Sequence, residues 1–219
     1  MNERFDLVIF DCDGVLVDSE VLAVEVDRRI LAEFGLHLTT EEVVERFMGK
    51  SAAALTAALE EHLGHQLPPD WDEQYKPWFF DAFESSLQQV DGIESALAEI
   101  SIMTCVASSG SHEKLRTTLG LTNLHTRFDG RIFSASEVTH GKPAPDLFLY
   151  AAAQMGVPAT RCVVIEDSKY GVRAARAAGM VAFGYAGGLT PREWLEDEGA
   201  TVFTSMVDLP ELLRTYSPE

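Results

Sequence analysis

The sequence predicts an α/β protein: a doubly wound parallel sheet that carries an inserted small α-helical domain. Short, wholly apolar runs alternate with stretches of helical pattern along most of the 219 residues. Such runs are typical of strands buried on both faces, and this alternation is typical of a parallel sheet. Residues 17–90 contain no convincing strand. We therefore expect an α/β core from residues 1–16 and 91–219 and a helical domain from residues 17–90.

Five apolar runs are the expected strands of the core. The first is LVIF at residues 7–10, and it ends in a turn marked by Gly14. The other four runs, in chain order, are residues 102–107, 162–165, 180–183 and the weaker 201–203. The helical patterns between them cover residues 93–100, 112–119, 146–155 and 168–178, and Gly179 fits the stop of the last helix.

The inserted segment reads as four helices, near residues 20–34, 40–47, 51–63 and 72–89. Thr39 and Glu42 have the spacing of a capping box at the start of the second helix. Five aromatic residues at roughly helical spacing are expected to pack this domain, with substrate stacking as the alternative. They are Trp71, Tyr75, Trp78, Phe79 and Phe83.

The composition excludes several partners. The formal charge is −18, so the chain lacks the basic surface that nucleic acids and anionic membranes attract. An anionic substrate would need a local cation. Cys12, Cys105 and Cys162 are too few for a disulfide framework and are expected to be buried thiols in a reducing cytoplasm. No apolar run is long enough to span a membrane, the N-terminus does not read as a signal peptide, and a monomer is the default expectation.

Carboxylates and small polar residues follow three of the expected strands. Asp11 and Asp13 follow the first strand, residues 108–110 (SSG) follow the second, and Glu166 and Asp167 follow the third of the runs in chain order. In an open parallel sheet these positions share one edge, where ligands bind. Four carboxylates there would repel one another unless a hard cation is bound, and carboxylate oxygens suit Mg²⁺. Because Mg²⁺ is often shared with substrate phosphate, a phosphate-bearing substrate follows.

Lys142 is the expected positive charge at this edge. Pro143 and Pro145 stiffen its loop, and Asp146 has the position to cap the helix that follows. A lysine held there would serve an attacked phosphate and an aspartate nucleophile. His140 is interpreted as a loop residue rather than a catalyst.

These segments resemble the motifs of the haloacid dehalogenase superfamily. Residues 11–20 (DCDGVLVDSE) resemble its first motif, Ser108 its second, Lys142 its third and residues 166–171 (EDSKYG) its fourth. Their order and spacing agree over nearly the whole chain. The insert resembles the helical cap of the β-phosphoglucomutase-like branch.

The resemblance implies a role for each site residue. Asp11 would attack phosphorus and form an aspartyl-phosphate, while Asp13 would first protonate the leaving oxygen and then deprotonate water. Mg²⁺ would be held by an Asp11 carboxylate oxygen, the Asp13 backbone carbonyl, Asp167 and Glu166. Lys142 would balance the charge of Asp11 and the phosphoryl group. The groups that would grip phosphate oxygens are Ser108 and the backbone N–H groups of Ser109 and Gly110.

The resemblance favours a Mg²⁺-dependent phosphatase acting on small phosphate monoesters, with sugar or sugar-acid phosphates as the expected substrates. Asp13, Glu166 and Asp167 argue against dehalogenation, and the absence of lysine from residues 15–49 argues against phosphonate hydrolysis. A hexose-phosphate mutase is the alternative, although Ala23 and Ala52 stand where β-phosphoglucomutase has a histidine and an arginine. A non-catalytic phosphate-binding regulator is the third interpretation, after the phosphatase and the mutase.

Lys50 is the candidate for contacting the non-reacting part of the substrate. It is one of few basic residues in an acidic insert, and it lies in a turn between two expected helices. A solvated turn lysine is the alternative interpretation.

Overall fold

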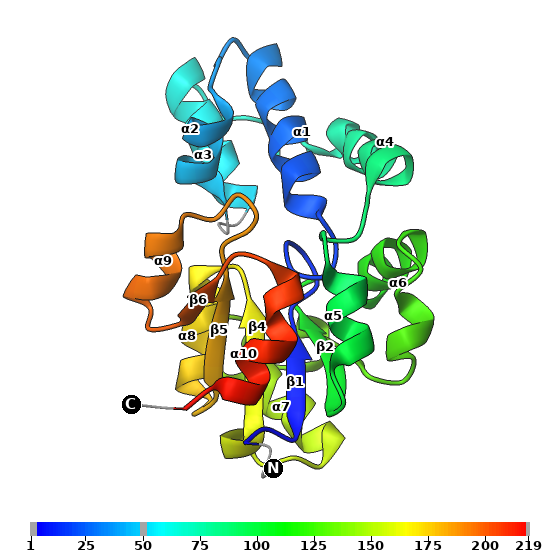
Figure 1. Ribbon diagram of the computed structural model, residues 1–219. Coiled ribbons are helices and arrows are strands. Elements are labelled where there is room, and N and C mark those ends of the chain that lie inside the picture. Colours follow the sequence, from blue (N-terminus) through cyan, green and yellow to red (C-terminus); the bar gives the residue numbers. More distant parts are fainter. Residues whose placement is uncertain (1–3, 49–51, 218–219) are drawn as a thin grey trace. The chain divides into compact units, whose positions relative to one another are not determined.

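A six-stranded parallel sheet forms the centre of the computed structural model, which describes residues 4–48 and 52–217 (Figure 1). This architecture confirms the predicted α/β fold. In the described part of the chain the strand order is β3-β2-β1-β4-β5-β6. The strands are β1 (Leu7–Phe10), β2 (Met103–Ser108), β3 (Ile132–Ser134), β4 (Cys162–Glu166), β5 (Val181–Tyr185) and β6 (Thr201–Phe203).

Strand β3 is the one that the apolar runs missed. It is three residues long, and only Ile132 and Phe133 are apolar. It pairs in parallel with the end of β2, where Ser108 lies opposite Ser134. A neighbouring strand, rather than its own composition, makes this segment a strand.

Helices cover both faces of the sheet. The core helices are α5 (Ile93–Glu99), α6 (His112–Leu121), α7 (Asp146–Met155), α8 (Lys169–Ala177), α9 (Arg192–Asp197) and α10 (Leu209–Thr215). Short 3₁₀ helices occur at His125–Phe128, Ala135–Glu137, Ala159–Arg161 and Met206–Asp208. Figure 1 shows α5 and α10 in front of the sheet and α7 behind it. Helices α9 and α10 were not among the predicted elements.

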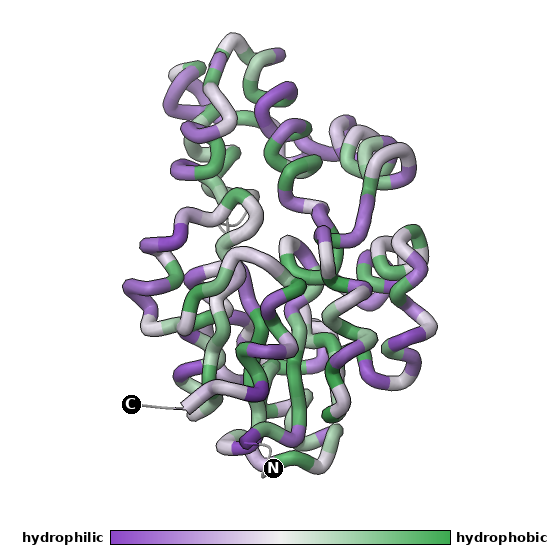
Figure 2. The backbone as a smooth tube through the Cα atoms, in the orientation of Figure 1, coloured by the Kyte–Doolittle hydropathy of each residue, from purple (hydrophilic) through white to green (hydrophobic). Residues whose placement is uncertain are grey.

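The burial of β1 explains its apolar sequence. Leu7 and Ile9 pack in one hydrophobic cluster with side chains of α7 and α8. Because successive side chains of a strand point to opposite faces, Val8 and Phe10 enter the other layer, where Phe10 meets Phe128 edge-on. All four residues of β1 have no exposed side-chain surface. Figure 2 shows the same strand as a continuous hydrophobic segment.

The register of β1 with its two neighbours aligns their carboxyl ends. Phe10 pairs with Val106 of β2 and with Ile165 of β4. The backbone N–H of Asp11 then donates to the Ile165 carbonyl at 2.9 Å. The residues that follow these three strands therefore start from one level at one edge of the sheet.

Details of the helix ends both confirm and correct the sequence-based expectations. Gly179 follows α8 with a φ of 72°, a left-handed conformation that is typical of the residue after a helix. The three cysteines, also as expected, are free thiols and are buried. The expected cap at Asp146 is wrong. Helix α7 begins at Asp146 itself, with Pro145 as an N-cap that makes no side-chain cap bond, and Asp146 instead lies 3.1 Å from His140 Nδ1.

A second compact unit spans Ser19–Leu87, and the secondary structure of its described residues is helical. Met1–Asp18 and Gln88–Glu219 form the first unit. The helices of the second unit are α1 (Ser19–Glu33), α2 (Thr40–Phe47), α3 (Ala52–Leu63) and α4 (Lys76–Ser86), with a 3₁₀ turn at Glu73–Tyr75 before α4. The capping box of Thr39 and Glu42 is present. Within residues 4–48 and 52–217, no helix has the length and apolarity to cross a membrane.

Aromatic rings pack the interior of this helical unit. Trp71 and Tyr75 are buried, and edge-on contacts link them to Phe34 and Trp78 at centroid distances of 5.2–6.2 Å. Trp71 also donates from its indole nitrogen to Thr56 at 3.1 Å. Packing is thus the role of Trp71, Tyr75 and Trp78, as the sequence predicted.

We predict that Asp27 of α1 makes the stability of the protein depend on pH. Burial raises the pKa of Asp27 to about 6, whereas an unfolded aspartate titrates near 4. The unfolded chain therefore releases this proton first, and the folded state loses stability as the pH rises from about 4 to about 6 and stays less stable above. Asp27→Asn should raise the free energy of unfolding by about 1–3 kcal/mol at pH 8 and by less at pH 5.

Thermal melts of wild type and Asp27→Asn at both pH values measure this effect. The exposed Asp81 of α4 supplies the control, Asp81→Asn, which should change stability little at either pH. A gain of equal size at pH 5 and pH 8 would contradict the assignment, because a charge penalty must grow with ionisation.

Candidate active site

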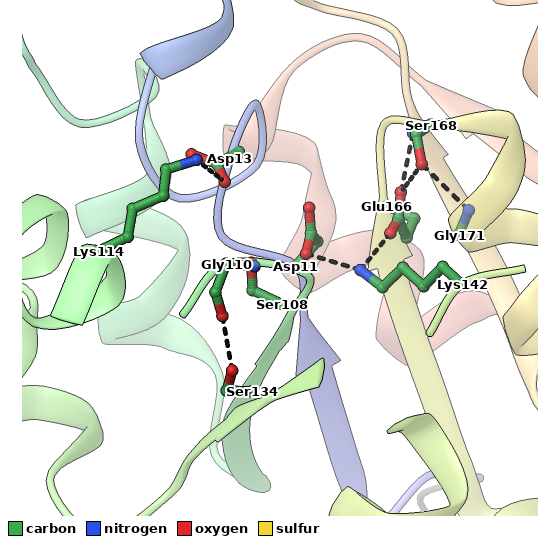
Figure 3. Close-up of polar contacts among 10 residues, drawn as sticks. All are labelled: Asp11, Asp13, Ser108, Gly110, Lys114, Ser134, Lys142, Glu166, Ser168 and Gly171. Atoms are coloured by element: carbon green, nitrogen blue, oxygen red, sulfur yellow. Dashed lines mark hydrogen bonds and ion pairs between the residues drawn. The ribbon is translucent and has the colours of Figure 1, made fainter. Parts of the chain in front are cut away.

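The carboxyl ends of β1, β2 and β4 bring the predicted site residues to one edge of the sheet (Figure 3). Asp11 follows β1, Ser108 ends β2, and Glu166 ends β4. Asp167 comes next, and Lys142 reaches the same place from the loop before α7. Asp11, Ser108, Glu166 and Asp167 are all buried.

Lys142 joins two of these carboxylates. Its Nζ lies 2.7 Å from Asp11 Oδ1 and 2.6 Å from Glu166 Oε1, and 5% of its side chain is exposed. Burial disfavours the ammonium form, but Asp11 and Glu166 outweigh it and raise the pKa of Lys142 above the usual value. Lys142 is therefore a fixed positive charge beside Asp11.

The surroundings of Asp11 shift the pKa of its carboxyl group. Burial raises the pKa of Asp11 to about 7, Lys142 opposes that shift, and the charges of Glu166 and Asp13 add to it. A further cation beside Asp11 would stabilise its ionised form, which is the nucleophilic one.

Asp11, Glu166 and Asp167 form a cluster with the donor chemistry of a metal site. One carboxylate oxygen from each lies within 4.8 Å of the others. Lys142 balances one of the three negative charges, and the remaining charge suits a divalent cation. The donors are hard oxygen atoms, as Mg²⁺ requires. These residues therefore fit the predicted ion.

Glu166 is held firmly by the start of α8. Its Oε2 accepts hydrogen bonds from the backbone N–H of Ser168 at 2.8 Å and from the Ser168 hydroxyl at 2.9 Å. The Ser168 hydroxyl accepts in turn from the Gly171 N–H at 3.0 Å, which caps the helix. A side chain at Gly171 would not fit, because its Cβ would lie 1.7 Å from Glu166 Oε1.

Asp13 lies apart from this cluster. Its Oδ2 is 2.7 Å from Nζ of Lys114, a residue of α6, and Figure 3 shows its carboxylate turned toward that lysine. Gly14 follows with a φ of 73°, and its N–H donates to the Val17 carbonyl at 2.9 Å. This tight turn lets Asp11 and Asp13, two residues apart, face different lysines.

Lys114 is a residue that the sequence analysis missed. A lone lysine on a predicted helix is usually solvated, and its partner lies 101 positions away in the chain. The start of α6 directly after residues 108–110 was the available signal, because the first turn of that helix must lie at the same edge.

Ser134 is a second missed residue, and it supports the loop after β2. Its buried hydroxyl donates to the Gly110 carbonyl at 2.7 Å. The Gly110 N–H donates to the Ser108 hydroxyl at 3.2 Å. Ser109 is exposed. Lys50, the remaining predicted site residue, lies outside the described residues.

Comparisons with known proteins agree with this arrangement. The sequence profile described as "Haloacid dehalogenase-like hydrolase" matches residues 8–185. The chain is 31% identical to 6-phosphogluconate phosphatase of Escherichia coli K12 over 95% of both chains. It is 34% identical to fructose-1-phosphate phosphatase of the same strain over 83% of this chain and 97% of the other.

A solved structure of similar fold comes from Agrobacterium tumefaciens. It is a conserved haloacid dehalogenase-like protein of unknown function, 38% identical, with a TM-score of 0.89 over 95% of this chain and 97% of that one. The matched profile spans β1 through β5 and so includes the helical unit inserted after β1. The chain therefore belongs to the haloacid dehalogenase-like hydrolases, in their helical-cap, β-phosphoglucomutase-like branch.

Proposed function

We propose that this protein is a Mg²⁺-dependent phosphatase that hydrolyses small phosphate monoesters, chiefly sugar and sugar-acid phosphates. One observation carries the proposal. Buried Asp11 is paired at 2.7 Å with a buried lysine beside two further carboxylates, while Asp13, two residues on, lies outside that cluster. This pattern supports our assignment of Asp11 as the nucleophile and Asp13 as a separate proton-transfer group.

The proposed reaction has two half-reactions. An Asp11 carboxylate oxygen attacks phosphorus, the bond from phosphorus to the ester oxygen breaks, and Asp13 gives its proton to the departing alcohol. Asp13 then takes a proton from a water molecule that attacks the same phosphorus. Inorganic phosphate leaves and Asp11 regains its carboxylate, so each group returns to its starting state.

Positioned positive charge supports both half-reactions. Lys142 lies between Asp11 and Glu166, where it offsets the charge that gathers as carboxylate and phosphate approach each other. Ser108 and the backbone N–H groups of Ser109 and Gly110 are our candidates for the phosphate oxygens. Asp11, the Asp13 carbonyl, Glu166 and Asp167 would hold Mg²⁺, which when bound neutralises phosphate charge and orients the phosphoryl group.

The substrate class is inferred from the relatives. Both named Escherichia coli relatives act on a phosphorylated sugar or sugar acid, and the similarity to the first covers nearly the full length of both chains. A hexose-phosphate mutase is disfavoured because Ala23 and Ala52 replace the basic residues that a bisphosphate would need. Lys50 remains our candidate for the distal end of the substrate.

A phosphate-release assay over a panel of phosphorylated sugars and sugar acids, with and without Mg²⁺, tests the proposal. We expect Mg²⁺-dependent release of phosphate, fastest with a sugar or sugar-acid phosphate. Formation of an isomeric sugar phosphate without free phosphate would instead show a mutase. Binding of phosphate esters without turnover of any of them, p-nitrophenyl phosphate included, would show a regulator.

A further inference from the structure

The two aspartates after β1 have separate lysine partners. Asp11 pairs with Lys142, which comes from the loop before α7 and is 5% exposed. Asp13 pairs with Lys114 of α6, which is 41% exposed. Two carboxylates this close in the chain repel each other, and Asp13 indeed helps to raise the pKa of Asp11. Figure 3 shows the two lysines approaching from opposite sides.

The backbone of Lys114 is anchored at the start of α6, which limits where its side chain can place the ammonium group beside Asp13. It lies in the first turn of α6, where its backbone N–H donates to Oγ of the N-cap residue Ser111 at 3.3 Å. Its aliphatic stem passes beside Gly110, where a Cβ would lie 3.4 Å from Lys114 Cδ.

We propose that Lys114 is a positioning residue for proton transfer: its ammonium holds the Asp13 carboxyl group apart from Asp11, on the side where the leaving group departs. The inference rests on the proposed phosphatase function and adds a residue to its machinery. A general acid acts only from hydrogen-bond distance of the oxygen that it protonates. Without Lys114, Asp13 would lose this restraint, and a displacement of about 1 Å can cost 100-fold in rate.

The test compares substrates that differ in their need for an acid. An alkoxide leaves poorly unless protonated, whereas p-nitrophenolate is a stable anion and needs little help. The quantity to measure is kcat/KM, because it reports the steps up to release of the leaving group and excludes hydrolysis of the phosphoenzyme. Wild type, Lys114→Met and Lys114→Arg are compared on p-nitrophenyl phosphate and on the best sugar phosphate of the panel.

For Lys114→Met we expect kcat/KM to fall by roughly 10-fold to 100-fold on the sugar phosphate and by less than about threefold on p-nitrophenyl phosphate. Lys114→Arg should recover part of the loss, since it keeps the charge. Lys76→Met is the matched control, because Lys76 also pairs with a carboxylate, Glu73, but lies in the helical unit and is 64% exposed. Circular dichroism confirms that each variant is folded.

A double-mutant cycle decides whether Lys114 acts through Asp13. In an Asp13→Asn background, Lys114→Met should change kcat/KM for the sugar phosphate by less than about twofold, against the 10-fold to 100-fold loss expected when Asp13 is present. Equal losses on the two substrates, no loss on either, or a full loss in the Asp13→Asn background would each overturn the inference. Failure of wild type to hydrolyse even p-nitrophenyl phosphate would refute the phosphatase function itself and, with it, this role for Lys114.

Discussion

Asp11→Asn is expected to lower kcat for phosphate monoesters by on the order of 10⁴-fold or more while the protein stays folded. An amide has no anionic oxygen with which to attack phosphorus, so the covalent route is closed. The fold should persist because an asparagine oxygen can still accept from Lys142, and Lys142 keeps its second partner, Glu166, at 2.6 Å. Steady-state kinetics with p-nitrophenyl phosphate, together with a thermal melt, measure both parts.

Asp6→Asn is the matched control for this substitution. Asp6 immediately precedes β1 and pairs with Arg161 at 2.6 Å, but 44% of its side chain is exposed. It should retain activity close to wild type, because an exposed ion pair contributes little to stability. Activity of Asp11→Asn within tenfold of wild type would remove Asp11 from the role of nucleophile.

Removal of divalent metal should have the second-largest effect. In excess EDTA we expect activity to fall at least about 100-fold, since a bound divalent ion contributes several kcal/mol of charge stabilisation, and Mg²⁺ should restore it. Ca²⁺ should inhibit, because it takes more ligands in a looser geometry. Undiminished activity in excess chelator would contradict a metal-dependent mechanism.

Asp167→Asn and Glu166→Gln separate the two metal-binding candidates on β4 and its loop. Both oxygens of Glu166 already accept hydrogen bonds from the protein, from Lys142 and from Ser168. We therefore expect Asp167→Asn to raise the Mg²⁺ concentration for half-maximal activity more than Glu166→Gln does. Stabilisation by added Mg²⁺ in thermal melts supplies a readout that does not depend on turnover. The opposite ranking in both measurements would make Glu166 the dominant ligand.

The parts of the fold that could be predicted are those whose own residues carry a recognisable pattern. A strand buried on both faces must be apolar along its buried length, and β1 and the first four residues of β4 are, so LVIF and CVVI stand out. Asp11 and Glu166 could be placed together because parallel strands that start in register end in register.

The parts that were missed depend on distant partners. Strand β3 forms by pairing with the edge of β2, and its three residues are too few to show the apolar pattern of a buried strand. The same holds for Lys114 and Ser134, whose partners Asp13 and Gly110 are far away in sequence. Asp146 was misjudged because an aspartate after Pro145 suits an N-cap and a first helical turn equally well, and here it begins the helix.

The most direct test of the account is to find the phosphate on Asp11. Wild type is quenched in acid during turnover of a sugar phosphate and digested with trypsin, which cuts after Arg4 and Arg28 and so yields a peptide of residues 5–28. Fragment-ion mass spectrometry then locates the modification. We predict a hydroxylamine-labile phosphate on Asp11 that Asp11→Asn does not form. A phosphate on Asp13 or on any other peptide, formed at the rate of turnover, would contradict the central claim.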